Sequence, residues 1–261
     1  MARAMWKASL ELGKVKVPVK LYGAVEERAI HFRLLHDTDL VPVHQRIVDP
    51  RTEQEVPPEA IQRAVELEEG LFVVLDAKER EAIRPAASRS IEVMRVVPRD
   101  AVDVAWYDRP YYLGPDGASS DYFAVAKVLE QSGQLGIARW AMRNQQYFGA
   151  LEPRDGRLAL ISLHAAGEVV PASALGRTEG PAISAAERKL GEQLVAALAG
   201  PFDPEQLHDD YRERVEKMIA AKRRGRKFRV KETMPARADG ALGQVLKRSL
   251  RMAKERGRAA A

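Results

Sequence analysis

Apolar and polar residues alternate along much of the chain up to about residue 165, as they do in strands that bury one face. The clearest run is Val15–Tyr22, in which Val15, Val17 and Val19 share one face and lysines occupy the other. Pro18 has no amide hydrogen to donate to a neighbouring strand, so we expect this strand to lie at an edge or to contain a bulge.

Shorter runs of the same kind predict further strands, which turn residues such as Gly, Pro and Asp separate. The candidates are Trp6–Leu12, Leu71–Leu75, Ser90–Val97, Tyr111–Leu113, Gly136–Met142 and Leu158–Leu163. Many short strands with frequent turns favour an antiparallel barrel or sandwich.

Helical patterns are rare at first and dominate after about residue 180. One helix is predicted at Asp121–Gln131, inside the strand-rich region. Ser184–Glu187 has the spelling of a capping box, and leucines recur every four residues after it. A second helix is predicted from Asp203 through Ile219, because Asp and Pro are typical of a first helical turn. The fold class is therefore α+β, and mainly β.

Charge is distributed unevenly along the chain. The 42 Lys and Arg residues and the 37 Asp and Glu residues give a total net charge of only +5. Residues 221–261 hold 14 basic and three acidic residues, a net charge of +11, so residues 1–220 carry −6. A basic tail of this kind is typical of proteins that bind polyanions. Within the body, Glu53–Glu81 is acidic, with nine acids and three bases.

Candidate catalytic chemistry is sparse. The chain has no cysteine, which excludes disulfides and thiolate sites and fits a reducing cytoplasm. Its five histidines lack the spacing of metal ligands, and neighbours such as Asp209 and Asp210 point about 100° apart on a helix. Phosphate-binding loops of the GxxxxGK[ST] type and GxSxG elbows are absent. We therefore expect no enzymatic activity, no metal and no cofactor.

Membrane signals are also absent from the sequence. No stretch approaches the roughly 18–20 apolar residues of a membrane span, and no apolar segment follows Met1-Ala2-Arg3 as in a signal peptide. We expect a cytoplasmic protein that has no membrane partner. The basic amphipathic pattern of Ala241–Arg256 leaves one weaker alternative, binding to an anionic membrane surface.

Several segments, taken together and in order, match one known family. They are Ala4–Lys7, Leu12–Tyr22, Ile30–His36, Asp108–Pro115, Gly136–Arg143, Glu187-Arg188 and Phe202–Arg212. These segments resemble the bacterial Ku family, the DNA-end-binding proteins of non-homologous end joining, over residues 3–225. Two stretches, Arg63–Glu66 and Leu163–Glu168, depart from the usual spelling of the family.

The resemblance implies a Ku-core-like antiparallel β-barrel with an arching bridge that encircles DNA. It assigns residues 1–175 to barrel and bridge, 176–220 to a C-terminal helical arm with the ligase-recruiting region, and 221–261 to a flexible basic extension. It also implies a homodimeric ring that binds double-stranded DNA ends independently of sequence. This ring would recruit and stimulate DNA ligase D in double-strand break repair, in the cytoplasm and on the nucleoid.

The DNA-facing surface should be basic. A protein that accepts any break cannot read bases, so it should contact phosphates and sugars through Lys and Arg. Basic residues inside or beside the matching segments, and the first cations of the tail, are therefore the candidates. They are Lys14, Lys16, Lys20, Arg28, Arg33, Arg84, Arg139, Arg143, Lys222, Arg223, Arg224, Arg226 and Lys227.

Aromatic residues near these segments have two interpretations. Trp6, Tyr22, Tyr111 and Trp140 are possible stacking platforms, but duplex bases are not exposed, which favours packing in the core or an interface.

The arm and tail have separate expected roles. The helix that carries Tyr211, Arg214, Val215 and Met218 resembles the region implicated in ligase recruitment. We hypothesise that the tail adds DNA affinity, retains the ring on internal duplex or bridges two ends, and its cations predict a steep salt dependence.

Two other function classes remain open. A nucleoid-associated architectural protein would bind through its tail without end specificity. A metal-dependent nuclease or end-processing factor would need clustered carboxylates, which the sequence does not display.

Overall fold

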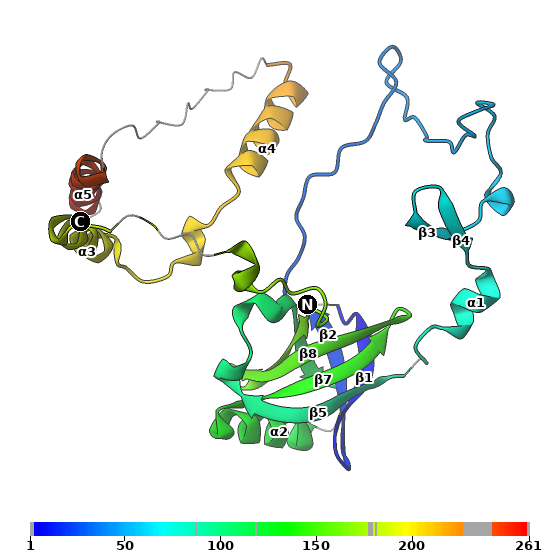
Figure 1. The fold of residues 1–261 in the computed structure, drawn as a ribbon, viewed down its shortest axis with the longest axis horizontal. Helices are drawn as coiled ribbons and strands as arrows, with labels where there is room; N and C mark the ends of the chain where they lie inside the picture. Colours follow the sequence, from blue (N-terminus) through cyan, green and yellow to red (C-terminus); the bar gives the residue numbers. More distant parts are fainter. Residues whose placement is uncertain are drawn as a thin grey trace. The chain divides into compact units, whose positions relative to one another are not determined.

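The computed structural model describes residues 3–86, 88–117, 119–176, 180, 182–226 and 242–259. The chain divides into two compact units, Met1–Ala174 and Leu175–Ala261 (Figure 1). The first unit contains the strands, and most of the helical residues belong to the second.

Seven strands of the first unit close into a barrel. They are β1 (Trp6–Leu12), β2 (Val15–Gly23), β5 (Ser90–Pro98), β6 (Tyr107–Pro115), β7 (Gln134–Met142), β8 (Gln145–Arg154) and β9 (Arg157–Leu163). Their order around the barrel is β1-β2-β6-β9-β8-β7-β5. The prediction of a barrel is confirmed, with one correction: β5 pairs with β1 in parallel, so the barrel is mixed. A parallel pair requires a long connection, and here the chain between β2 and β5 provides it.

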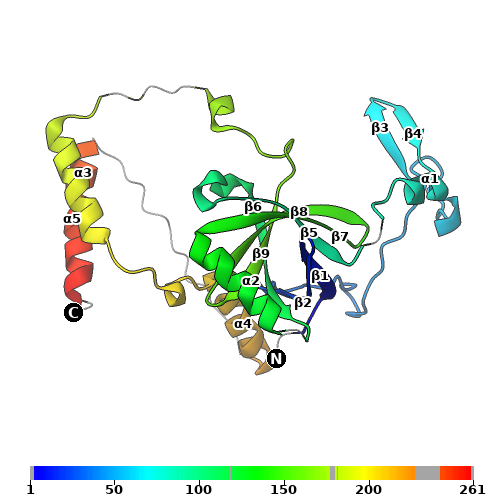
Figure 2. The same ribbon diagram turned by 90° about the horizontal axis from the view of Figure 1, so that it is seen from below.

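The barrel interior is the hydrophobic core. In β2, Val17, Val19 and Leu21 alternate inward and are at most 1% exposed, as the alternating pattern predicts, whereas Val15, at the start of the strand, is 50% exposed. Helix α2 (Ser119–Ser132) contacts β2, β7, β8 and β9, and its buried Tyr122 belongs to the same cluster (Figure 2). The same core cluster therefore contains side chains from strands on different sides of the barrel.

Pro18 does not place β2 at an edge, contrary to the sequence-based expectation. Strand β2 pairs with β1 on one side and β6 on the other. The carbonyl of Pro18 accepts a hydrogen bond from the Asp116 amide at 3.0 Å, just beyond the last β2–β6 pair, Val19 with Pro115. The missing amide hydrogen therefore faces Asp116 at the end of this ladder, so the β1–β2 pairing and the remaining β2–β6 pairing are kept.

Residues 24–89, which connect β2 to β5, form a segment that we call the bridge. It contains β3 (Ala64–Glu68), β4 (Leu71–Val74), α1 (Ala77–Ala82) and a 3₁₀ turn at Pro58–Ala60. Figure 1 shows the bridge outside the barrel. All residues of β3 and β4 are exposed, and these two strands pair only with each other. The bridge therefore lacks a core of its own within the described chain.

In the second unit, one helix begins later in the sequence than predicted. Helix α3 (Ala185–Leu198) starts at Ser184 with the predicted capping box. The helix expected from Asp203 is wrong there, because only a 3₁₀ turn, Pro204–Gln206, follows it. Helix α4 (Asp210–Arg223) starts after a second cap, Asp209, whose side chain accepts from the Arg212 amide. Two capping aspartates compete for this segment, and the later one begins the helix.

Helix α5 (Leu242–Ala259) packs against α3, and both figures show the two side by side. The half-buried residues of each helix lie on one face. They are Glu187, Leu190, Gly191 and Leu194 on α3, and Val245, Leu246, Ser249 and Leu250 among the described side chains of α5. Lysines and arginines occupy the exposed face of α5. No helix in the described ranges is long and apolar enough to cross a membrane.

Candidate nucleic-acid interface

Two of the predicted cations form cross-strand ion pairs on the outer face of the barrel. Lys16 Nζ lies 3.2 Å from Glu11 Oε1, and Arg139 Nη2 lies 2.7 Å from Glu92 Oε2. Each pair joins residues directly opposite each other on neighbouring strands. Exposed pairs of this kind contribute about 0–1 kcal/mol, so a phosphate group can compete with the carboxylate for the cation.

Lys20 belongs to a three-residue cluster. Asp116 binds Lys20 Nζ at 2.7 Å and Lys7 Nζ at 3.0 Å. Lys7 and Lys20 face each other across β1 and β2, and like charges in that position repel unless an anion lies between them. The hydrogen bond from Lys20, and then that from Lys7, lowers the pKa of Asp116, and the same carboxylate raises the pKa of Lys20. Asp116 therefore masks two barrel lysines.

Two further predicted cations lie at hairpin turns. Lys14 is exposed beside Gly13, whose φ of 59° suits the first position of the β1–β2 turn. Arg143 and Asn144 form the two-residue β7–β8 turn, with φ of 53° and 64°. A left-handed backbone is unfavourable for arginine and acceptable for asparagine, so the turn fixes Arg143 at some conformational cost.

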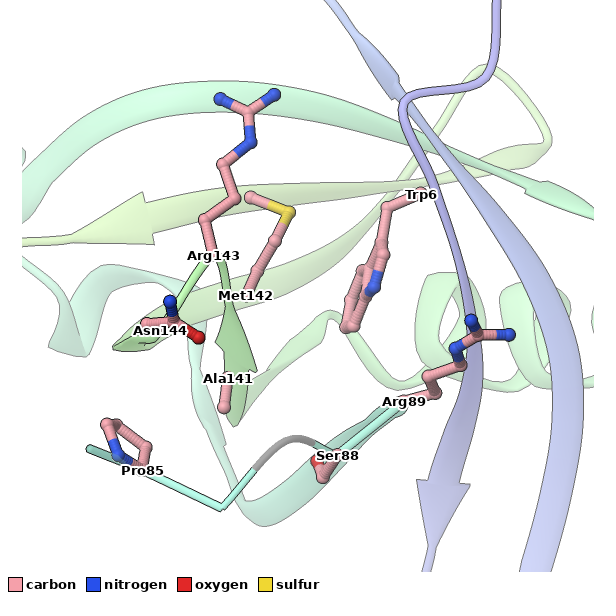
Figure 3. A pocket seen from close by; sticks show the side chains of 8 residues that line it. All are labelled: Trp6, Pro85, Ser88, Arg89, Ala141, Met142, Arg143 and Asn144. Carbon is pink, nitrogen blue, oxygen red and sulfur yellow. The ribbon is translucent and has the colours of Figure 1, made fainter. Parts of the chain in front are cut away.

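Arg143 lines a pocket of about 220 Å³ at one end of the barrel. Figure 3 shows the thioether of Met142 beside the ring of Trp6, with the side chains of Arg143 and Arg89 flanking them. The lining is completed by Pro85, Ser88, Ala141 and Asn144. None of the described residues that line this pocket is acidic, and two guanidinium groups border it, so its chemistry suits an anion such as a phosphate.

Both ends of the bridge join the barrel where this pocket lies. Strand β1 begins at Trp6, which pairs with Leu21 near the end of β2. Strand β5 runs parallel to β1 and begins beside it, with Ser90 opposite Ser9. The bridge therefore leaves and returns at one end of the barrel, which we call the root end.

The predicted bridge cations lie toward its two ends. Arg28 Nη2 is 3.6 Å from Glu26, Arg33 is exposed, and Arg84 pairs with Glu81. The middle of the bridge is acidic, since its nine basic residues are outnumbered by 14 acids that lie mostly between residues 49 and 81. Residues 49–81 hold ten acids and four bases, a net charge of −6, whereas the rest of the bridge holds four acids and five bases, a net charge of +1. The middle of the bridge therefore disfavours polyanions more than its two ends do.

The predicted tail cations begin at the end of α4. Lys222, Arg223, Arg224 and Arg226 are exposed there, where the negative end of the helix dipole favours cations. Lys227 lies outside the described residues.

The residues predicted to recruit the ligase are unequally accessible. Tyr211 is 59% exposed, and Arg214 is exposed with its Nε donating to the Asp210 carbonyl at 3.0 Å. Met218 is half-buried, and Val215 is 4% exposed. Tyr211 and Arg214 are the members of this group that a partner protein can contact directly.

Sequence reasoning missed Lys7 and Arg89, and it could not place Arg143 beside Trp6. Trp6, Arg89 and Arg143 are far apart in the sequence and come together only when the barrel closes through the parallel β1–β5 pair. Lys7 lies elsewhere, where it shares Asp116 with Lys20. Across the described ranges, no group of three His, Asp or Glu side chains is arranged to hold a metal ion.

Comparisons with known proteins agree on one family. Residues 11–192 match the family described as the Ku70/Ku80 beta-barrel domain. The chain is 36% identical over 250 residues to "Non-homologous end joining protein Ku 2" of Geotalea uraniireducens (strain Rf4), covering 95% of this chain and 97% of that protein. It is 35% identical over 260 residues to "Non-homologous end joining protein Ku" of Anaeromyxobacter sp. (strain K), covering 98% and 88%. The chain is 32% identical over 232 residues to the Archaeoglobus fulgidus protein of the same name, and the match covers 88% of this chain and 92% of that protein.

Proposed function

Because the chain belongs to the Ku family, we propose that two copies form a ring which threads onto DNA ends and brings DNA ligase D to them. As a Ku protein of non-homologous end joining, the chain binds DNA ends in double-strand break repair and is not an enzyme. Our proposal adds three properties, which are the ring, binding that is independent of DNA sequence, and the ligase partner. We also propose that the protein acts in the cytoplasm, on the nucleoid.

The bridge carries the argument for a second copy. It exposes a large apolar surface, which includes Phe32 at 69%, Leu34 at 64%, Leu40 at 67% and Phe72 at 58%. An isolated two-stranded hairpin such as β3–β4 is marginally stable in water, and exposed apolar patches of this extent mark interaction sites. Two bridges that bury these faces against each other would close a symmetric ring.

The position of the cations supports DNA as the occupant of the ring. Arg89 and Arg143 border the pocket at the root end, and Arg28, Arg33 and Arg84 lie along the bridge near its junctions with the barrel. Duplex held there would meet lysine and arginine, which contact phosphates without reading bases. A closed ring admits a duplex only at its terminus, which explains the requirement for an end.

A competition experiment tests ring threading. Labelled linear duplex is bound by the full chain in the presence of excess closed circular DNA, and then with both termini blocked by bulky protein caps. Threading predicts that circular competitor has little effect and that blocking the ends abolishes binding. An architectural protein that coats DNA would lose binding to the circular competitor and would be insensitive to the blocked ends.

A substitution in the bridge tests the dimer. Leu34→Asp should give a monomer of 29.0 kDa by light scattering and lose the preference for ends, because a charge would be buried in the dimer interface. Val128→Asp on α2 is the matched control, since its side chain is also 64% exposed and lies outside the bridge. A dimeric Leu34→Asp protein with normal end binding would contradict the proposed interface.

Ligase recruitment is tested on the exposed residues of α4. The double variant Tyr211→Ala with Arg214→Ala should lose co-precipitation of ligase D and retain binding to DNA ends. Arg188→Ala on α3 removes an equally exposed arginine outside the proposed contact. Unchanged ligase capture by the double variant would place the ligase contact elsewhere.

A further inference from the structure

A second cleft, larger than the pocket at the root end, lies on the outer face of the barrel. It has a volume of about 630 Å³, within the range of small-ligand sites. Its lining combines two tyrosines, two arginines and several backbone segments. The lining residues are Tyr22, Gly23, Tyr112, Leu113, Gly114, Arg154, Asp155 and Arg157.

The two tyrosines are cross-strand partners on β2 and β6, so their rings emerge from the same face of the sheet. Tyr22 is held in place by a close approach to Gly114, where an added Cβ would lie 3.1 Å from the ring carbon Cε2. Tyr112 is 47% exposed, although it is large and partly apolar. One ring is therefore packed and the other is available to stack on a planar group.

The arginines lie on the other side of the cleft, at the β8–β9 turn. Arg154 Nη2 is 2.5 Å from Glu152 Oε1, and Glu152 is 4% exposed, so this arginine has a fixed partner. Arg157 is exposed and has no ion pair among the residues that the structure describes. Asp155 is the one acid among the described lining residues, and since Glu152 neutralises Arg154, Arg157 is the cation that remains for a ligand. Arg157 can bind a phosphate while a base stacks on Tyr112.

The cleft adjoins Lys20, one of the cations predicted to bind DNA. Lys20 lies two residues before Tyr22 on β2, and alternate residues of a strand share a face. Lys20 also pairs with Gly114, which lines the cleft. A phosphate that displaces Asp116 from Lys20 would therefore bring the next nucleotide of the strand to the tyrosines.

Bases of an intact duplex are stacked on each other and cannot use such a platform. An unpaired nucleotide can, because its base exposes both faces. We propose that the cleft formed by Tyr22, Tyr112, Arg154 and Arg157 binds an unpaired nucleotide of a single-stranded DNA overhang. This inference rests on the proposed function and adds that the protein distinguishes overhanging from blunt ends.

Equilibrium binding to matched duplexes tests the inference. The full chain should bind an end with a short single-stranded extension at least about fivefold more tightly than a blunt end, since stacking of one base gives an effect of that size. The double variant Tyr112→Ala with Arg157→Ala should bind both ends equally, with the affinity for the blunt end unchanged. Tyr112→Phe should keep the preference, because the ring remains.

Phe123→Ala provides the matched control, since Phe123 is 50% exposed and lies on α2 outside the cleft. It should leave the preference intact. Failure to bind any end would contradict the proposed function itself, whereas normal blunt-end binding without a preference would overturn only the inference. Equal losses of both affinities in the double variant would also overturn it, because the residues would then belong to the duplex surface.

Photocrosslinking gives an independent readout. A 5-iodouracil base at the first unpaired position should form an adduct with Tyr112 or Tyr22, identified by mass spectrometry of the digested protein. Adducts confined to other residues would contradict the site. The site would also be contradicted if the double variant Tyr112→Ala with Arg157→Ala kept the overhang preference but lost capture of ligase D. The cleft would then bind a protein partner.

Discussion

Gly149 shows how a single residue permits the packing of the barrel. An added Cβ there would lie 2.7 Å from the Ile161 carbonyl oxygen and 2.7 Å from Cζ3 of Trp140. The first is backbone of the neighbouring strand, and the second belongs to a ring that is 2% exposed and stacked on Tyr147. Neither atom can move without disturbing the core.

Gly149→Ala should therefore destabilise the protein by about 1–3 kcal/mol, the cost of overpacking a core. Chemical denaturation of the two proteins measures the difference. Gly167→Ala is the control, because no atom lies within 4 Å of an added Cβ at that loop position. Equal midpoints for Gly149→Ala and the unmodified protein would show that the barrel relaxes around Trp140.

Asp116 controls the charge of the barrel surface, because it binds both Lys7 and Lys20. Asp116→Asn should free two cations for phosphate. We expect tighter binding to duplex and a salt slope that is steeper by about 0.9 for each phosphate newly contacted. Measurements of affinity against salt concentration test this, with Glu216→Gln on α4 as a control that removes a carboxylate far along the chain.

The effect of Asp116→Asn should not vary with pH near neutrality. The lowered pKa of Asp116 means that its contribution is present above the ordinary aspartate pKa and lost as the pH falls through the folded value. The raised pKa of Lys20 means that its contribution is lost only as the pH rises through a value above the ordinary lysine range. Between about pH 5 and 9 both groups are charged. A pH-dependent difference in that window would assign the effect to other groups.

At the scale of elements, one buried hydroxyl group forms hydrogen bonds between α2 and the barrel. Tyr122 is fully buried, its hydroxyl donates to the Leu113 carbonyl, and it accepts from the Leu158 amide at 2.8 Å. Leu113 and Leu158 are the last paired residues of β6 and β9 at that end. The hydroxyl thus continues the ladder between them, and burial raises its pKa.

Tyr122→Phe should remove this link and leave a buried amide and a buried carbonyl unpaired. The expected cost is about 1–3 kcal/mol in the free energy of unfolding, measured by denaturation. Tyr112→Phe is the control, because it deletes a hydroxyl from a ring that is 47% exposed. If both substitutions cost the same, the contribution of the Tyr122 hydroxyl is not structural.

The sequence predicted strands well where one face is buried and the other is exposed, as in β2. Strand β8 was missed because it has no such alternation: Ala150, Leu151 and Glu152 are all buried, and Glu152 is held by Arg154 and Arg99. Most of β6 was missed because Pro110 and Gly114 resemble turn residues.

The candidate site was predictable in composition but not in arrangement. Runs of lysine and arginine point to a polyanion, and the resemblance of short segments indicates which one. Which side chains face the same way depends on the order of the strands, and the β1–β5 pairing leaves no signal in a single sequence. The sequence alone therefore could not predict that Arg89 and Arg143 line the same pocket.

At the scale of the whole molecule, the basic tail adds to a body for which we propose a DNA surface of its own. Helix α5 rests its apolar face on α3 and exposes Lys247 and Arg248. Removal of the whole tail would uncover the apolar face of α3. A loss of DNA binding could then come either from the lost charge or from the lost structure. Substitution of exposed cations on α5 separates the two effects.

The double variant Lys247→Gln with Arg248→Gln should keep its preference for linear over closed circular DNA, because we propose that this preference comes from the ring. Its affinity should fall at low salt, and the salt slope should decrease by up to about 2, since each phosphate contact contributes about 0.9. Circular dichroism checks that the helix content is unchanged. An unchanged slope would exclude these two cations from contact with DNA, whereas a lost preference for ends would show that end recognition depends on the tail.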